Sequence, residues 1–224
     1  MSYSGQTYYP CKKSQFSNLV QDTTHTTGTW TDTQFGINIS KNNNGSYSGL
    51  ITMLQSCPAT PYSAICHIKY NSVQGNGVNT SFGDPGSGEA SQGLCLSNGT
   101  STSSGVKFNF AGTLNGSATA SGQPINLFGF ACPYYFSNYT SPSGGGTFYQ
   151  HCSTMYGAYG VWQKIHDDGA NLTYYQSSDG ITWVSIATES RTNNFTASYV
   201  GVGGNPYGAN LNFNVVSFQC ATNL

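Results

Sequence analysis

The clearest pattern of apolar and polar positions lies in the last third of the chain, over residues 161–220. Apolar-rich runs with many β-branched and aromatic side chains alternate there with short polar turns. Two of the turns contain Asp168-Gly169 and Asp179-Gly180, dipeptides that reverse a chain tightly because glycine accepts a positive φ. The pattern predicts three strands joined by two hairpins, followed by two further strands.

A similar pattern continues upstream. Residues 33–40 and 62–70 alternate apolar and polar positions, as a strand with one buried face does. Residues 125–131 are a further expected strand, whereas residues 134–146 are expected to form an aromatic, glycine-rich loop. No ten-residue segment places apolar residues at helical spacing behind a cap. The chain is therefore predicted to be all-β, a two-sheet antiparallel β-sandwich of roughly 12 strands with little or no helix.

The length fits one domain. A chain of 224 residues is within the range of a single sandwich. The first residues are polar and rich in tyrosine, so we expect an N-terminal arm over residues 1–14 and one sandwich domain over residues 15–224. No linker or internal repeat divides the sequence further.

The C-terminal pattern also carries a family resemblance. It is similar to the C-terminal half of concanavalin A-like, laminin-G-type jelly-roll modules, which occur in bacteriophage virion proteins and bacterial surface proteins. The resemblance rests on Val-Trp-Gln-Lys-Ile-His-Asp-Asp-Gly at 161–169, Leu-Thr-Tyr-Tyr-Gln-Ser-Ser-Asp-Gly-Ile-Thr-Trp at 172–183 and Tyr-Val-Gly-Val-Gly-Gly at 199–204. It implies a lectin-like jelly roll but no particular ligand, because modules of this shape bind sugars, bind proteins or cover a surface.

The charge content is low. Charged residues are 7% of the chain and the net charge is −1, whereas charged residues are roughly 25% of an average soluble domain. The sequence has no basic patch of the kind that binds nucleic acid. It also has no apolar run approaching the roughly 18 residues of a membrane-spanning helix. Neither nucleic acid nor a membrane is therefore an expected partner.

The sequence gives little indication of a catalytic site. Glycoside hydrolysis usually needs two carboxyl groups that flank the bond, but the only glutamates, Glu89 and Glu189, fall in expected loops. Asp167, Asp168 and Asp179 fall in expected turns. His151 and Cys152 are neighbours on an expected strand and would point to opposite faces. The chain is expected to be no enzyme and to need no cofactor.

Asp167, Asp168 and Asn171 are weak candidates for a metal site. They supply clustered oxygen atoms beside a glycine, as a calcium loop does. Calcium takes six to eight oxygen ligands, and the same residues are those that a hairpin turn prefers. The sequence favours the turn, so no metal is expected.

Seven cysteines leave two alternatives open. Either the cysteines pair in disulfides and leave one thiol free, or they are buried free thiols that pack as small apolar residues. If a disulfide forms, the first candidate is Cys57–Cys66, because the turn at residues 58–61 can bring these two residues together.

An aromatic segment supplies the candidate contact site. Aromatic faces and amides suit both sugar binding and protein contacts. Three alternatives remain open in this order: a protein partner, rings folded over the core, and a glycan. The candidate residues are Tyr134, Tyr135, Asn138 and Tyr139, with Tyr149, Tyr156 and Tyr159 nearby.

Low charge and the resemblance together lead to a functional hypothesis. The chain is expected to be a non-enzymatic structural protein of a bacteriophage virion, which decorates or cements the capsid or tail. Its expected partners are other virion proteins and further copies of itself, on the surface of the extracellular particle. The alternatives are a tail module that binds host-surface glycans and, third, a jelly-roll polysaccharide hydrolase.

Overall fold

The computed structural model describes residues 2–3, 6–7, 10–24, 26–42, 49–70, 90–116, 125–140, 144–152, 161–206 and 210–222. In residues 2–3, 6–7, 90–91, 110–116, 125–131 and 144–152, and at positions 70 and 161, the description covers the backbone only.

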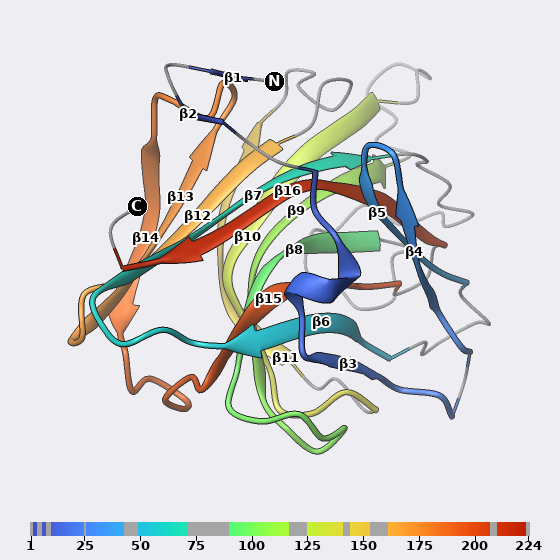
Figure 1. Ribbon diagram of the computed structural model, residues 1–224, viewed down its shortest axis with the longest axis horizontal. Helices are drawn as coiled ribbons and strands as arrows, with labels where there is room; N and C mark the ends of the chain where they lie inside the picture. The colour runs from blue at the N-terminus through green and yellow to red at the C-terminus, as the bar shows by residue number, and fades with distance from the viewer. Residues whose placement is uncertain are drawn as a thin grey trace.

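Two seven-stranded antiparallel sheets form the molecule (Figure 1). The strands of the first sheet are, in spatial order, β11 (Gly144–Cys152), β10 (Ile125–Phe136), β9 (Val106–Gly116), β8 (Ala90–Ser97), β15 (Tyr199–Asn205), β6 (Ile51–Ser56) and β3 (Asn18–Gln21). Those of the second sheet are β14 (Val184–Ser190), β13 (Asn171–Ser177), β12 (Val161–Asp167), β7 (Tyr62–Tyr70), β16 (Leu211–Ala221), β5 (Gly36–Lys41) and β4 (Thr29–Thr33).

The N-terminal part adds a small hairpin and one short helix. Strands β1 (Ser2–Tyr3) and β2 (Gln6–Thr7) pair with each other, and η1 (Lys13–Gln15) is a 3-10 helix. Cys11 lies within the expected arm, yet it is fully buried in the main core and its backbone N–H bonds to Val216 O at 3.0 Å. Phe16 packs on Phe218 with ring centroids 4.9 Å apart. The chain therefore enters the core before the expected domain boundary at residue 15.

The predicted all-β, two-sheet antiparallel sandwich is confirmed. Strands β12, β13 and β14 form the expected meander, and the two turn glycines, Gly169 and Gly180, have φ of 95° and 75°. The strands outnumber the roughly twelve expected, in part because residues 29–33 form an edge strand. The predicted loop at 134–146 is wrong at both ends, since β10 continues to Phe136 and β11 begins at Gly144.

Apolar side chains fill two layers. The main core lies between the sheets, where Leu94 and Leu96 of β8 pack with Ile165 of β12. Cys95 belongs to a second cluster with Phe108 and Tyr139. Because successive strand residues point to opposite faces, this second cluster covers the outer side of the first sheet. Within the described residues, no helix is long and apolar enough to cross a membrane.

Candidate functional site

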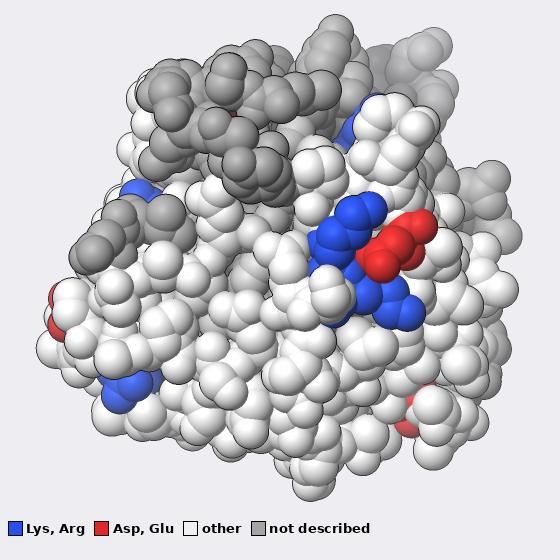
Figure 2. Space-filling view, viewed as in Figure 1, with Lys and Arg blue, Asp and Glu red and all other residues white. Residues whose placement is uncertain are grey.

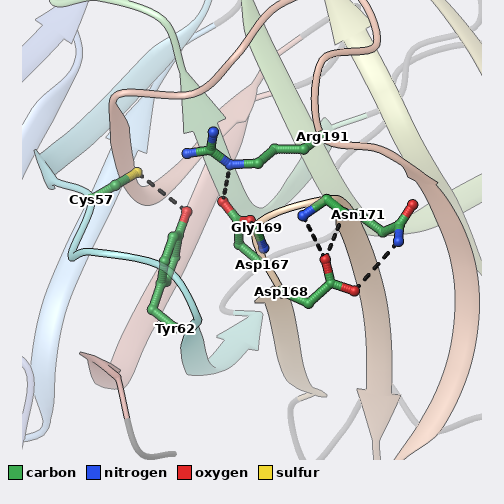
Figure 3. A network of polar contacts seen from close by, with 8 residues as sticks. Cys57, Tyr62, Asp167, Asp168, Gly169, Asn171 and Arg191 are labelled. Atoms are coloured by element: carbon green, nitrogen blue, oxygen red, sulfur yellow. Dashed lines mark hydrogen bonds and ion pairs between the residues drawn. The ribbon is translucent and has the colours of Figure 1, made fainter.

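The turn between β12 and β13 holds a buried carboxylate. Asp167 ends β12, and its Oδ2 accepts a hydrogen bond from Arg191 Nε at 2.8 Å. Its Oδ1 accepts from Gly169 N at 3.0 Å, so each oxygen has a protein donor (Figure 3). The bond to Asp167 raises the pKa of Arg191. This ion pair fastens the turn to the segment that follows β14.

Asp168 points the other way and closes the turn on itself. Its Oδ1 accepts from the backbone N–H groups of Ala170 at 2.7 Å and Asn171 at 2.6 Å. These two bonds lower the pKa of the Asp168 carboxyl. The predicted turn chemistry is confirmed. The two aspartates face different partners (Figure 3), and in the described part of the chain no three His, Cys, Asp or Glu residues are grouped to hold a metal ion. Asp167, Asp168 and Asn171 thus do not converge as a ligand set.

The predicted disulfide is wrong, because Cys57 and Cys66 are free thiols with different partners. Tyr62 Oη donates a hydrogen bond to Cys57 Sγ at 3.2 Å (Figure 3). Cys66 lies in the main core, where its thiol donates to Gln163 Oε1 at 3.7 Å. Burial raises the pKa of Cys57 to about 11 and that of Cys66 well above its usual range. The alternative of free thiols describes both residues, with Cys66 buried and Cys57 half-buried.

The candidate Tyr139 lies inside the molecule. It is fully buried in the second cluster, and its hydroxyl is 2.7 Å from Thr52 Oγ1. Its backbone N–H bonds to Thr102 O at 2.9 Å, and its carbonyl accepts from Leu50 N at 3.1 Å. For this residue, the alternative of a ring folded over the core is confirmed, so Tyr139 cannot be a surface contact.

The other aromatic candidates are placed differently. Tyr134 packs on Phe136 with centroids 4.7 Å apart, and Tyr135 packs on Phe195 at 5.8 Å. Asn138 Oδ1 accepts from Thr140 N at 3.0 Å. Tyr134 and Tyr135 are consecutive strand residues on opposite faces, so these side chains do not form one contact surface. The Tyr149 side chain, Tyr156 and Tyr159 lie outside the described residues.

A buried ion pair joins the two sheets. Lys107 of β9 lies 3.0 Å from Glu189 Oε1, with side chains 1% and 8% exposed. Tyr174 Oη donates to the same oxygen at 2.7 Å, and Asn193 Nδ2 donates to Oε2 at 2.6 Å. Burial and the neighbouring Glu189 raise the pKa of Tyr174. The expected loop position of Glu189 is wrong, because Glu189 lies in β14 and its carboxylate faces the first sheet.

The outward side of the second sheet carries a group of aromatic and basic side chains. His67 and Trp162 face each other across β7 and β12 and stack with centroids 4.5 Å apart at 5°. Lys164 Nζ lies over the rings of Tyr175 at 4.5 Å and Trp183 at 4.9 Å. We call these five residues the aromatic face.

Strand alternation explains the aromatic face and could have revealed it. Gln163 and Ile165 of β12 are fully buried in the sandwich. Trp162 and Lys164 therefore point to the other side. The signal was present in the sequence of β12, but alternation alone does not tell which of its two sides lies inside.

Comparisons with known proteins give only distant structural similarity. No family model matches the chain, and no curated protein matches it. A functionally unknown protein from Saccharomyces cerevisiae is similar at a TM-score of 0.48 with 10% identity, over 95% of this chain and 99% of that one. The GH43 protein BlXynB (K247S mutant) from Bacillus licheniformis is similar at 0.48 with 13% identity, over 86% of this chain and 34% of that one.

A third solved structure has a comparable TM-score. The VIP36 exoplasmic/lumenal domain in its Ca2+/Man-bound form gives a TM-score of 0.46 with 12% identity, over 87% of this chain and 81% of that one. Similarity of this size carries no argument about ligand or activity. By its own sheet topology, the chain is a two-sheet antiparallel β-sandwich, the architecture that the sequence resemblance implied.

Proposed function

We propose that this chain is a non-enzymatic binding protein, a structural protein of a bacteriophage virion that decorates or cements the capsid or tail. The observation that carries the proposal is the state of its acidic side chains. Each acid among the described residues accepts hydrogen bonds that hold the fold: Asp22, Asp32, Asp167, Asp168, Asp179 and Glu189. A glycosidase needs one carboxyl that donates a proton and a second that acts as base or nucleophile. Acids held in turns and ion pairs suit neither role.

The surface supports a protein that works in contact with neighbours. On the face seen in Figure 2, the largest basic patch lies beside an acidic one over the region of η1 and β4, and the other charged patches are small and scattered. Lys12 Nζ donates there to Thr33 O at 2.9 Å, and Asp32 accepts from Lys13 N at 2.9 Å. Short polar side chains lose little conformational entropy when covered, so such a surface suits close packing in a particle.

Localisation on the particle tests this proposal. Immunogold electron microscopy with antibodies against the purified chain should label an intact virion, and the recombinant chain should bind particles that lack it. A chain that stays monomeric and binds no particle would contradict the proposal. Release of reducing sugar from any polysaccharide in a screen would contradict its non-enzymatic part.

A tail module that binds host-surface glycans is the second candidate, favoured by the aromatic face. The rings of Tyr175 and Trp183 are half-buried, and an aromatic ring can stack on the C–H face of a sugar. Immunogold labelling distinguishes the two candidates. Antibodies against a decoration protein label the shell or the tail tube, whereas antibodies against a receptor-binding module label the tail tip.

A further inference from the structure

Lys164 occupies an unusual position on the aromatic face. It is directly opposite Tyr175 across the β12–β13 pair, and its ammonium lies over the rings of both Tyr175 and Trp183. Contact with two rings restricts the long side chain and holds its charge at one place by cation–π attraction. The lysine is therefore oriented before any ligand arrives.

The polar atoms of Lys164, Tyr175 and Trp183 are available to hydrogen-bond a ligand. Among the described residues, the Lys164 ammonium has no hydrogen bond or ion pair, and neither the Tyr175 hydroxyl nor the Trp183 indole N–H has a hydrogen-bond partner. All three groups can donate hydrogen bonds. They thus form a local set of donors around one positive charge.

No acid in the described part of the chain forms an ion pair with Lys164. Asp167 is committed to Arg191, and Glu189 to Lys107. Asp179 uses Oδ1 to accept from the backbone N–H groups of Ile181 and Thr182, both at 2.8 Å. Partial burial lowers the pKa of Lys164, which marks an ammonium with reduced contact with water. An anion that binds such a group forms a charge-assisted hydrogen bond.

Hydroxyl groups continue the surface beyond the rings. Thr173 is two residues from Tyr175 on β13, so both lie on the same face. Its Oγ1 accepts from Thr188 Oγ1 at 3.2 Å. A ligand that reaches across the face would therefore meet two aromatic rings, one cation and a pair of hydroxyls.

We propose that this part of the aromatic face binds a glycan whose sugars carry carboxylates. A pyranose ring stacks on the ring face of Trp183 or Tyr175 that Lys164 leaves uncovered, its carboxylate accepts from Lys164, and its hydroxyls bond to Tyr175 Oη and the threonine pair. Aromatic rings alone would accept neutral sugars equally well, so the unneutralised lysine selects the acidic ones. The proposal goes beyond the virion role, because particle attachment can use any other surface.

Binding measurements with matched sugars test the site. Oligomers of polygalacturonate, alginate and hyaluronate are titrated by calorimetry and by tryptophan fluorescence, and fully methyl-esterified galacturonate oligomers are the neutral control. At least one acidic oligomer should bind and weaken as salt is raised. Lys164→Gln should weaken binding about tenfold or more, the effect of losing one charge-assisted hydrogen bond. Trp183→Ala should weaken it as well.

The matched control is Lys69→Gln, because Lys69 is an exposed lysine on the outward side of the neighbouring strand β7. It removes the same charge and should leave affinity within about twofold, well below the effect expected of a direct contact.

Unchanged thermal unfolding would show that the variants fold. No binding to any of the three acidic oligomers, equal binding of acid and ester, or equal effects of the two lysine variants would each overturn the proposal. Binding to polyglutamate but to none of the glycans would overturn it in favour of an acidic protein partner. None of these outcomes bears on particle attachment, which is measured separately.

Discussion

Gln163 Oε1 accepts a hydrogen bond from the backbone N–H of Leu94 at 2.8 Å and so joins the two sheets through the core. Gln163 is fully buried on β12, whereas Leu94 lies in the centre of β8. A buried backbone N–H must find an acceptor, and here the acceptor is a side chain of the opposite sheet. The contact therefore links β12 to β8 across the interface between the sheets.

Replacing this glutamine should destabilise the fold. Gln163→Leu replaces the buried amide with an apolar side chain of similar size and leaves the Leu94 N–H without its acceptor, at a cost of about 1–3 kcal/mol. Urea unfolding followed by circular dichroism measures the change. Gln219→Leu on the outward side of β16 is the control and should be close to neutral. Equal stability of Gln163→Leu and the parent protein would show that this contact does not matter.

The ion pair between Lys107 and Glu189 predicts a strongly non-additive pair of variants. Lys107→Met leaves the Glu189 carboxylate buried without its cation, which should cost about 3–5 kcal/mol. Adding Glu189→Gln removes the unpaired charge and should recover much of that loss, because Tyr174 can still donate to the amide oxygen. The free energies of unfolding of the three variants form a double-mutant cycle. Additive losses would contradict a direct interaction.

The turn before Trp183 should be sensitive to any side chain at Gly180. Its φ is 75°, and an added Cβ would lie 2.8 Å from Cε2 of the Trp162 indole. Gly169 has a φ of 95° but would place its nearest contact, Thr60 Oγ1, at 3.4 Å. Both alanine variants should lose about 1–2 kcal/mol from the left-handed backbone.

Gly180→Ala alone should lose more stability than this and should also shift the tryptophan emission, because only its added Cβ clashes with the Trp162 indole. Thermal unfolding and fluorescence spectra of the two variants measure the difference. If Gly169→Ala costs as much and shifts the emission equally, the close packing of Gly180 on Trp162 is not the cause.

Asp179 should make stability depend on pH in the acid range. Hydrogen bonds from the backbone N–H groups of Thr182 and Ile181 lower the pKa of its carboxyl to about 2, against about 3.9 in an unfolded chain. A lowered folded pKa means that the carboxylate stabilises the fold above about pH 4, and that this contribution is lost as the pH falls towards 2.

Asp179→Asn should therefore unfold at a lower temperature than the parent protein at pH 6, and the difference should shrink to near zero by about pH 2. Calorimetry at a series of pH values measures it. Ser178→Ala in the same turn changes no charge and should give a difference that does not vary with pH. A constant difference for Asp179→Asn would contradict the titration.

Local features of the sequence were sufficient to predict the architecture. Period-two alternation marks strand β7 over the very residues 62–70, because each side chain of a strand has one of only two directions. The Asp168-Gly169 and Asp179-Gly180 turns were predictable for the same local reason, since glycine alone accepts the required φ without strain. The sequence also showed how few charged groups the chain has for chemistry.

The candidate site depended on contacts that alternation does not specify. Lys107 and Glu189 are distant in sequence and meet only because β9 and β14 belong to facing sheets. Tyr139 was one of the candidate contact residues, but the segment after β10 folds back over the first sheet and buries it. Likewise, Lys164 and Trp183 come together only through the register of the meander. The sequence by itself determined which segments are strands and where they turn, whereas the packing of one sheet on the other decided which polar residues are buried partners and which face outward for a ligand.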